Sequence, residues 1–165
     1  MLRSDFNRGI TALAGTDLVY DILIYQRHLS IAGEFVDLHP EQIFVLDHLA
    51  KPPIREQRIS PWREQLKNLA ARPHVFCKLS GLVTEADWQH WTIDNLRPYF
   101  DAALDCFGPS RLLAGSDWPV CLLATDYARW WQTLGELVST LSPSEQAAIL
   151  GENAVRVYGL DSKAD

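Results

Sequence analysis

The chain has 165 residues and a formal net charge of −6 at pH 7, with 47% hydrophobic and 22% charged residues. This length and composition are typical of a globular protein with a sizeable core, so residues 1–165 are expected to form a single domain. The negative charge argues against a nucleic-acid partner, and no apolar run is long enough to span a membrane. Three cysteines without a Cys-x-x-Cys pair favour free thiols and a cytoplasmic location.

Short apolar runs alternate with amphipathic segments along the chain. The apolar runs predict four strands, at residues 18–25, 43–46, 75–79 and 112–114. Helices are predicted at residues 5–14, 30–38, 60–71, 93–107, 126–141 and 142–151, with a final turn at 153–158 and a frayed tail at 161–165.

Capping residues mark most of these helix ends. Ser30, Thr92 and the Ser142-Pro-Ser-Glu145 capping box are expected to open helices. Ser60-Pro61 predicts an N-cap followed by proline at the first helical position. Glycines at 15, 108 and 151 are expected to end helices.

The strands recur at intervals of roughly 25 to 35 residues, which is the length of a β-strand, helix, β-strand unit. Such alternation predicts an α/β fold with a parallel sheet that is buried on both faces. A compact, doubly wound binding domain is an alternative, although the chain contains no Gly-x-Gly-x-x-Gly or Walker motif.

Each predicted strand is followed by polar residues that an apolar core would not favour. They are Arg27 and His28, Asp47 and His48, Ser80 after Lys78, and Ser116 and Asp117. Because the carboxyl ends of parallel strands lie at one edge of a sheet, these groups are expected to converge in a site.

The chemistry that these residue types indicate is activation of water. Asp117 could accept a proton or hold a metal, although an Asp followed by Trp118 and Pro119 is also an ordinary turn. His48 could polarise a carbonyl, act as a base or bind a metal. We therefore predict a catalytic pair of Asp117 and His48.

Cationic residues near the same edge are predicted to bind substrate. Arg27, Lys51 and Lys78 could hold an anionic or polyhydroxylated molecule, and Trp118 could form a wall of the pocket. Asp47 is interpreted as a supporting hydrogen-bond acceptor or loop cap, and Arg27 is preferred to His28 as an anion ligand. Three further histidines, His39, His74 and His90, are interpreted as surface residues.

Three segments together resemble the amidohydrolase-2 family, and within it the sugar-lactone hydrolases of the L-fuconolactonase and L-rhamnonolactonase kind. The segments are Phe44-Val-Leu-Asp-His-Leu-Ala-Lys-Pro52, Cys77-Lys-Leu-Ser-Gly-Leu-Val-Thr-Glu85 and Gly115-Ser-Asp-Trp-Pro-Val120. The ending Gly151-Glu-Asn-Ala-Val-Arg-Val-Tyr158 is also similar to the last helix of that family.

The resemblance implies a hydrolase that opens a cyclic ester with an activated water, often at a divalent metal such as zinc or manganese. It implies that His48 is the histidine of the sixth strand of a (β/α)8 barrel. Asp117 would then be the aspartate of the eighth strand, which binds the metal or takes the proton of the water. A small-molecule lactone is the implied substrate.

A complete barrel of this kind has about 250 residues, so this chain resembles only half of one, with strands five to eight. The His-x-His pair of the family's first strand is absent, so the metal site is expected to be incomplete with His48 and Asp117 alone. A half-barrel exposes two sheet edges. We therefore expect a homo-oligomer or a complementing N-terminal half, and a catalytically incomplete fragment or subunit is the alternative function.

Overall fold

The computed structural model describes residues 1–160, and the predicted tail at 161–165 lies outside the described residues. Its centre is a parallel sheet in the order β1-β2-β3-β4. The strands are β1 (Tyr20–Ile22), β2 (Phe44–Leu46), β3 (Val75–Leu79) and β4 (Leu112–Ala114). This confirms the predicted parallel α/β architecture.

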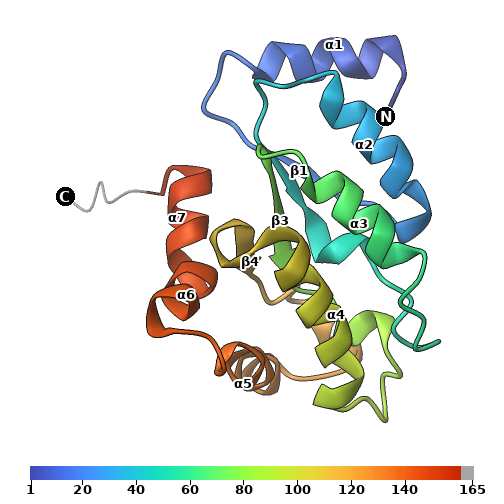
Figure 1. The fold of residues 1–165 in the computed structure, drawn as a ribbon, viewed down its shortest axis with the longest axis vertical. Coiled ribbons are helices and arrows are strands. Elements are labelled where there is room, and N and C mark those ends of the chain that lie inside the picture. The colour runs from blue at the N-terminus through green and yellow to red at the C-terminus, as the bar shows by residue number, and fades with distance from the viewer. Residues whose placement is uncertain (161–165) are drawn as a thin grey trace.

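The consecutive strand order decides between the two predicted arrangements. Right-handed crossovers between neighbouring parallel strands place every connecting helix on the same face of the sheet. These helices are α2 (Leu29–Asp37), α3 (Trp62–Ala70) and α4 (Ile93–Phe107), which lie together along one side of the strands in Figure 1. A doubly wound sheet would reverse its strand order, so that alternative is wrong.

The other helices pack around this unit. Helix α1 (Ser4–Leu13) precedes β1, and α5 (Tyr127–Val138) follows β4. After α6 (Pro143–Ala147), a π-helical segment (Ala148–Glu152) leads directly into α7 (Asn153–Tyr158). The helix therefore does not end at Gly151, in contrast to the prediction. No helix within residues 1–160 is long and apolar enough to cross a membrane.

Several predicted boundaries differ from the structure because tertiary packing decides them. The first strand is shorter than residues 18–25, since only three of its residues pair with β2. Helix α2 begins after His28 without a side-chain cap, so Ser30 is not an N-cap. Pro61 is itself the N-cap residue of α3, whose buried residues Trp62, Leu66 and Leu69 set the start of the helix.

Alternate strand residues face two different environments. Ile22, Phe44, Leu46, Cys77, Leu79 and Leu112 belong to the core cluster that includes the helices. The opposite face carries Asp21, Val45, Phe76, Lys78 and Leu113 at neighbouring register positions. In a closed barrel this second face would line the interior. Here Val45 and Leu113 on this face are already buried, at 0% and 1% exposed, beside the half-buried Asp21 and Lys78.

Candidate active site at the carboxyl ends of the strands

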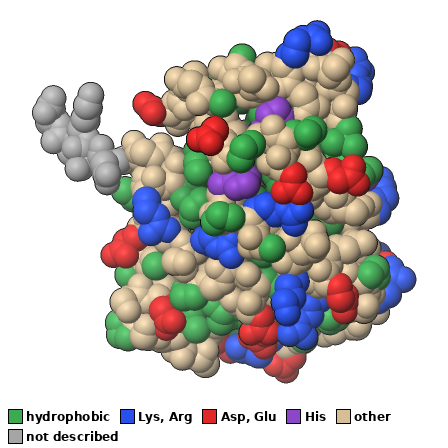
Figure 2. Space-filling model, turned by 45° about the horizontal axis from the view of Figure 1, so that its top comes forward, with side chains coloured by type: hydrophobic (Ala, Val, Ile, Leu, Met, Phe, Trp, Pro, Cys, Tyr) green, Lys and Arg blue, Asp and Glu red, His purple; other side chains and the backbone are tan. Residues whose placement is uncertain are grey.

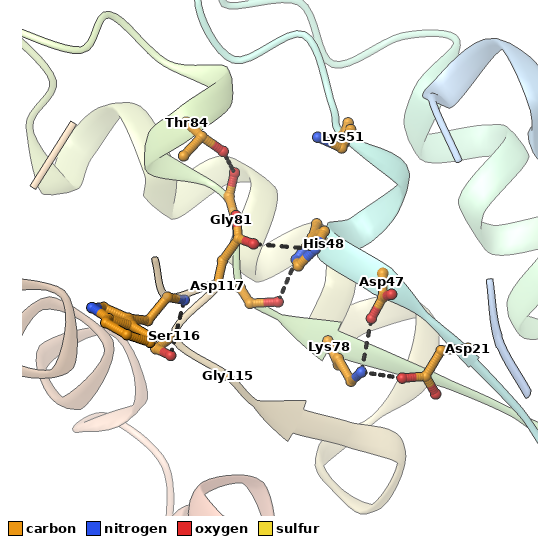
Figure 3. A network of polar contacts seen from close by, with 12 residues as sticks. Asp21, Asp47, His48, Lys51, Lys78, Gly81, Thr84, Gly115, Ser116 and Asp117 are labelled. Carbon is orange, nitrogen blue, oxygen red and sulfur yellow. Dashed lines mark hydrogen bonds and ion pairs between the residues drawn. The ribbon is translucent and has the colours of Figure 1, made fainter. Parts of the chain in front are cut away.

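His48 and Asp117 lie at the carboxyl ends of β2 and β4, as the sequence predicts. The His48 Nε2 atom is 3.4 Å from Asp117 Oδ1 (Figure 3), and only 15% and 10% of the two side chains are exposed. These residues are 69 positions apart in the sequence. Parallel strands therefore bring an imidazole and a carboxylate together at one half-buried edge of the sheet.

The backbone that carries His48 has an unusual conformation. Four consecutive residues, His48, Leu49, Ala50 and Lys51, have positive φ angles between 52° and 58°, and none of them is glycine. L-amino acids disfavour this left-handed region, and such strain persists only where surrounding contacts enforce it. Two of these contacts are the Trp62 indole N–H, which donates to Leu49 O at 2.8 Å, and Lys51 N–H, which donates to His48 O at 2.8 Å.

Ser80 and Gly81, at the end of β3, enclose the His48 ring. The Ser80 hydroxyl is 2.7 Å from His48 Nδ1, and Ser80 is only 1% exposed. Gly81 has a φ of +66°, and a Cβ atom there would lie 2.8 Å from His48 Cβ and Cγ. Glycine is therefore required at position 81 both by the backbone and by the imidazole.

A second glycine supports the same side of the site. A Cβ atom on Gly115 would lie 3.2 Å from Ser80 Cβ, so the serine also packs against bare backbone. The Trp130 indole N–H donates to Gly115 O at 2.7 Å and fixes the end of β4, just before Asp117. Asp117 has a positive φ of 55°, which aims its carboxylate back toward His48 (Figure 3).

Burial controls the protonation of His48. Desolvation lowers the pKa of this imidazole, and the nearby carboxylates of Asp117 and Asp47 oppose that effect only in part. The ring is therefore neutral at pH 7. A neutral imidazole can act as a hydrogen-bond donor, a proton acceptor or a metal ligand.

Lys78 lies in a separate polar network beside this pair. Its ammonium group hydrogen-bonds to Asp21 and lies 2.9 Å from Asp47 Oδ1, as an ion pair without well-aligned hydrogen-bond geometry. Tyr158 of α7 donates to Asp21 Oδ1 at 2.8 Å. Burial would lower the pKa of Lys78, but its contacts with the two carboxylates raise it above its ordinary value. Burial raises the pKa of Tyr158 to about 12.

This network bears on two predictions. Asp47 Oδ1 forms an ion pair with Lys78 but has no hydrogen-bond donor within residues 1–160, so its interpretation as a supporting acceptor or loop cap stays a prediction. Lys78 already has two carboxylate partners, and its substrate-binding role stays a prediction.

Arg27 and Lys51 line a cavity of about 310 Å³ at the same edge, together with Tyr25, Glu85 and Trp88. The Arg27 guanidinium carbon lies 4.9 Å and Lys51 Nζ 5.4 Å from the centre of the Tyr25 ring. Lys51 is paired with Glu85 at 3.3 Å, whereas Arg27 forms no ion pair within residues 1–160. The cavity thus combines cationic, anionic and aromatic groups.

The remaining predicted residues have varied positions. Trp118 is 62% exposed and does not line this cavity, so its role as a wall stays a prediction. His28 accepts a hydrogen bond from Arg27 Nε at 3.3 Å. The interpretation of His39 as a surface residue is wrong, because α1 covers it and its Nε2 lies 2.7 Å from Asn7 Oδ1. His74 is half-buried and His90 is exposed.

A divalent metal fits between His48 and Asp117 only as part of a larger ligand set. Zinc binds His and Asp ligands at about 2.0–2.2 Å, so two ligands at a tetrahedral angle are about 3.4 Å apart. The observed Nε2–Oδ1 distance of 3.4 Å agrees with that value. However, residues 1–160 contain no group of three or more His, Cys, Asp or Glu that could hold a metal ion, so further ligands would come from outside these residues.

Sequence reasoning did not assign roles to several groups that the structure brings to the site. The sequence marks Ser80 only as a polar residue after a strand and indicates no role for Asp21 or Tyr158. An acid within the otherwise apolar run at 18–25 was the available signal for Asp21. Tyr158 is 137 positions from Asp21, and its involvement has no local sequence signal.

Comparisons with known proteins extend these observations. A family model described as amidohydrolase matches residues 2–160. An L-fucono-1,5-lactonase of Burkholderia multivorans is 43% identical over 178 residues, covering 98% of this chain and 58% of the relative. An L-fucono-1,5-lactonase of Burkholderia ambifaria is 41% identical, covering 93% of this chain and 54% of the relative.

The fold is also similar to solved structures. A crystal structure of an amidohydrolase from B. multivorans with bound zinc has a TM-score of 0.92 and 43% identity, covering 95% of this chain and 58% of that one. The chain therefore spans somewhat more than half the length of the relatives that it matches. Because the family match extends over residues 2–160 and includes the strands that carry His48 and Asp117, this chain belongs to the amidohydrolase family.

Proposed function

We propose that this chain supplies His48 and Asp117 to the hydrolytic centre of an enzyme that opens a cyclic ester, a sugar lactone, with an activated water. The observation that carries the proposal is the 3.4 Å approach of His48 Nε2 to Asp117 Oδ1 at the carboxyl ends of parallel strands. The names of the two Burkholderia relatives support a lactone as the substrate class.

The two side chains have complementary tasks in such a reaction. The Asp117 carboxylate can accept a proton as a water oxygen attacks the lactone carbonyl carbon. The neutral His48 ring, oriented by the Ser80 hydroxyl at Nδ1, can polarise the carbonyl through a hydrogen bond or exchange a proton with the substrate. The ring C–O bond of the lactone then breaks, and the released alkoxide takes up a proton to give an open-chain hydroxy acid.

Arg27 and Lys51 are proposed to bind the hydroxyl-bearing part of the substrate. They line the 310 Å³ cavity together with Glu85 and Trp88, and the chain connects this cavity to His48 through Lys51, although neither His48 nor Asp117 lines it. Charged donors and acceptors can bind sugar hydroxyls, and an aromatic side chain can pack against the ring. Lys78 and Trp118 are proposed as further contacts.

A metal would act at the same position. Zinc or manganese, when bound by His48 and Asp117 with ligands from outside the described residues, would lower the pKa of a bound water and polarise the carbonyl. The zinc-bound amidohydrolase from B. multivorans supports this proposal.

The direct test is lactone hydrolysis, followed through proton release, with and without added Zn²⁺ or Mn²⁺. Replacing Asp117 with Asn should lower the rate at least about 10²-fold, as expected for loss of a general base or metal ligand. Asp101→Asn, at an exposed position of α4, is the matched control and should retain the wild-type rate. Equal rates for wild type and Asp117→Asn would exclude Asp117 from the centre.

A specific observation also favours the alternative of a catalytically incomplete half. Within residues 1–160, β1 and β4 each pair with a single neighbouring strand, and the apolar side chains of Leu18 and Leu23, which flank β1, are exposed. We propose that a polypeptide equivalent to the remaining part of the relatives completes the barrel and the set of metal ligands.

The surface in Figure 2 gives no support to a nucleic-acid partner, because acidic and basic side chains are interspersed on the visible face.

Assembly can be tested separately from catalysis. Light scattering on the purified chain will distinguish a monomer from a homo-oligomer. Adding the remaining segment of the B. multivorans relative as a separate polypeptide should produce a heterodimer and raise the lactonase rate. A chain that is fully active as a monomer would exclude the need for a complementing half.

A further inference from the structure

The hydroxyl group of Ser80 lies where it can determine which nitrogen of the His48 ring carries the proton. Its Oγ atom is 2.7 Å from Nδ1, whereas the other ring nitrogen, Nε2, faces Asp117 Oδ1 at 3.4 Å. A serine hydroxyl can either donate or accept a hydrogen bond, and a neutral imidazole has one donor and one acceptor nitrogen. Two arrangements are therefore possible, and they present different chemical groups to Asp117.

Hydrogen-bond accounting distinguishes the two arrangements. Ser80 is 1% exposed, and its hydroxyl has no partner other than His48 among the hydrogen bonds of residues 1–160. If Ser80 accepted a bond from Nδ1–H, its own buried hydrogen would have no acceptor. If Ser80 donates to Nδ1, that hydrogen is satisfied.

Electrostatics at the other nitrogen favours the same arrangement. The Asp117 carboxylate has only acceptor oxygens when ionised, so a bare Nε2 lone pair facing it at 3.4 Å would be repelled. A proton on Nε2 makes that contact attractive. Both ends of the ring thus agree on a donor Ser80 and a protonated Nε2.

The His48 ring is also closely packed. Gly81 lies against the imidazole, since a single Cβ atom on Gly81 would lie 2.8 Å from His48 Cβ and Cγ. Ser80 in turn packs against Gly115, whose carbonyl receives the Trp130 indole N–H. The donor hydroxyl is therefore part of a packed support.

We propose that Ser80 is a positioning residue that donates its hydroxyl hydrogen to His48 Nδ1 and thereby places the proton of the neutral ring on Nε2, facing Asp117. The inference deepens the proposed function and rests on it only for its catalytic meaning. In the metal-free chain, His48 then offers an N–H to the space that it shares with Asp117, and Asp117 is the member of the pair that can accept a proton.

The test is long-range ¹H–¹⁵N correlation spectroscopy on histidine-labelled protein at pH 8, with a chelator present, and with His48 assigned from a His48→Gln sample. The expected wild-type pattern is that of an Nε2–H ring, with the Nδ1 resonance shifted by an accepted hydrogen bond. In Ser80→Ala, the Nδ1 resonance should move toward the value of a ring nitrogen without a hydrogen bond. In Ser80→Cys, a weaker donor, it should move part of the way.

Ser116→Ala is the matched control, because Ser116 lies next to Asp117 and its hydroxyl accepts from Trp118 N, not from His48. It should leave the His48 resonances in place. An Nδ1–H pattern in the wild type would overturn the proposal, and so would an unchanged Nδ1 resonance in Ser80→Ala. The wild-type spectrum decides the tautomer even if a variant does not fold.

This outcome is separable from the proposed function. If the ring shows the expected pattern but Asp117→Asn retains full lactonase activity, the hydrolytic role fails and the Ser80 assignment stands. If Asp117→Asn is inactive but the ring carries its proton on Nδ1, the lactonase proposal stands and the Ser80 assignment fails.

Discussion

Adding one methyl group at Gly81 should displace the His48 ring, an effect that can be measured separately from the loss of folding stability. In Gly81→Ala, the new Cβ would lie 2.8 Å from His48 Cβ and Cγ, whereas ordinary contacts begin at 3.4 Å. The ring or the Gly81 backbone must therefore move by about 0.6 Å, the difference between these two distances. A shift of that size would lengthen the 2.7 Å contact between His48 Nδ1 and Ser80 Oγ beyond the usual range of an O–H hydrogen bond.

Backbone strain in Gly81→Ala adds a cost in folding stability, and a control variant can measure that cost separately. Alanine at a φ of +66° costs on the order of 1–3 kcal/mol in unfolding free energy. Gly108 has almost the same φ, +67°, but a Cβ there would meet nothing within 4 Å. Gly108→Ala is therefore a matched control that carries a backbone penalty without the contact to His48.

Urea denaturation and the His48 ring resonances together measure the two effects. Both variants should lose stability, but only Gly81→Ala should shift the His48 resonances and, in an active assembly, lower the lactonase rate. If Gly81→Ala leaves the His48 resonances at their wild-type positions, the enclosure of the ring by Gly81 is not tight, and the reasoning is refuted.

Two further predictions concern buried charge. Lys78→Met should destabilise the fold by about 3 kcal/mol at pH 7, because it leaves the Asp21 and Asp47 carboxylates without their shared cation. An unchanged unfolding free energy in urea denaturation would contradict this. Burial lowers the pKa of His39 in the folded state below its ordinary value of 6.5. The folded state therefore prefers the neutral imidazole, and this contribution to stability is present above pH 6.5 and is lost as the pH falls through the folded-state pKa. His39→Gln should therefore flatten the pH dependence of stability below about pH 6.5, and an unchanged slope would show that other groups cause it.

Local patterns were sufficient for the general architecture. Apolar runs of strand length separated by amphipathic segments predicted the four strands and most of the helices, and the capping residues Thr92 and Ser142 do open α4 and α6. The predicted convergence of His48 and Asp117 also followed from local information, because every parallel strand delivers its last residues to the same edge.

Helix ends without strong caps were predicted less well. The start of α3 depends on burying Trp62, and the continuation past Gly151 depends on Asn153, whose side chain donates to Pro109 O and Leu112 O at 2.8 Å. These partners are distant in the sequence. Neither contact leaves a signal in the local pattern, so propensity alone placed these boundaries incorrectly.

The amino-acid sequence by itself determined the parallel strand–helix units, the family resemblance and the pair of residues that meet at the sheet edge. Only the tertiary structure decided the left-handed turn at His48, the enclosure of its ring by Ser80 and Gly81, and the pairing of Lys78 with Asp21 and Asp47. The physical reason is that periodicity and turn propensity act over a few residues. Strain, burial of charge and hydrogen-bond partners are set instead by groups that come together only when the sheet has formed.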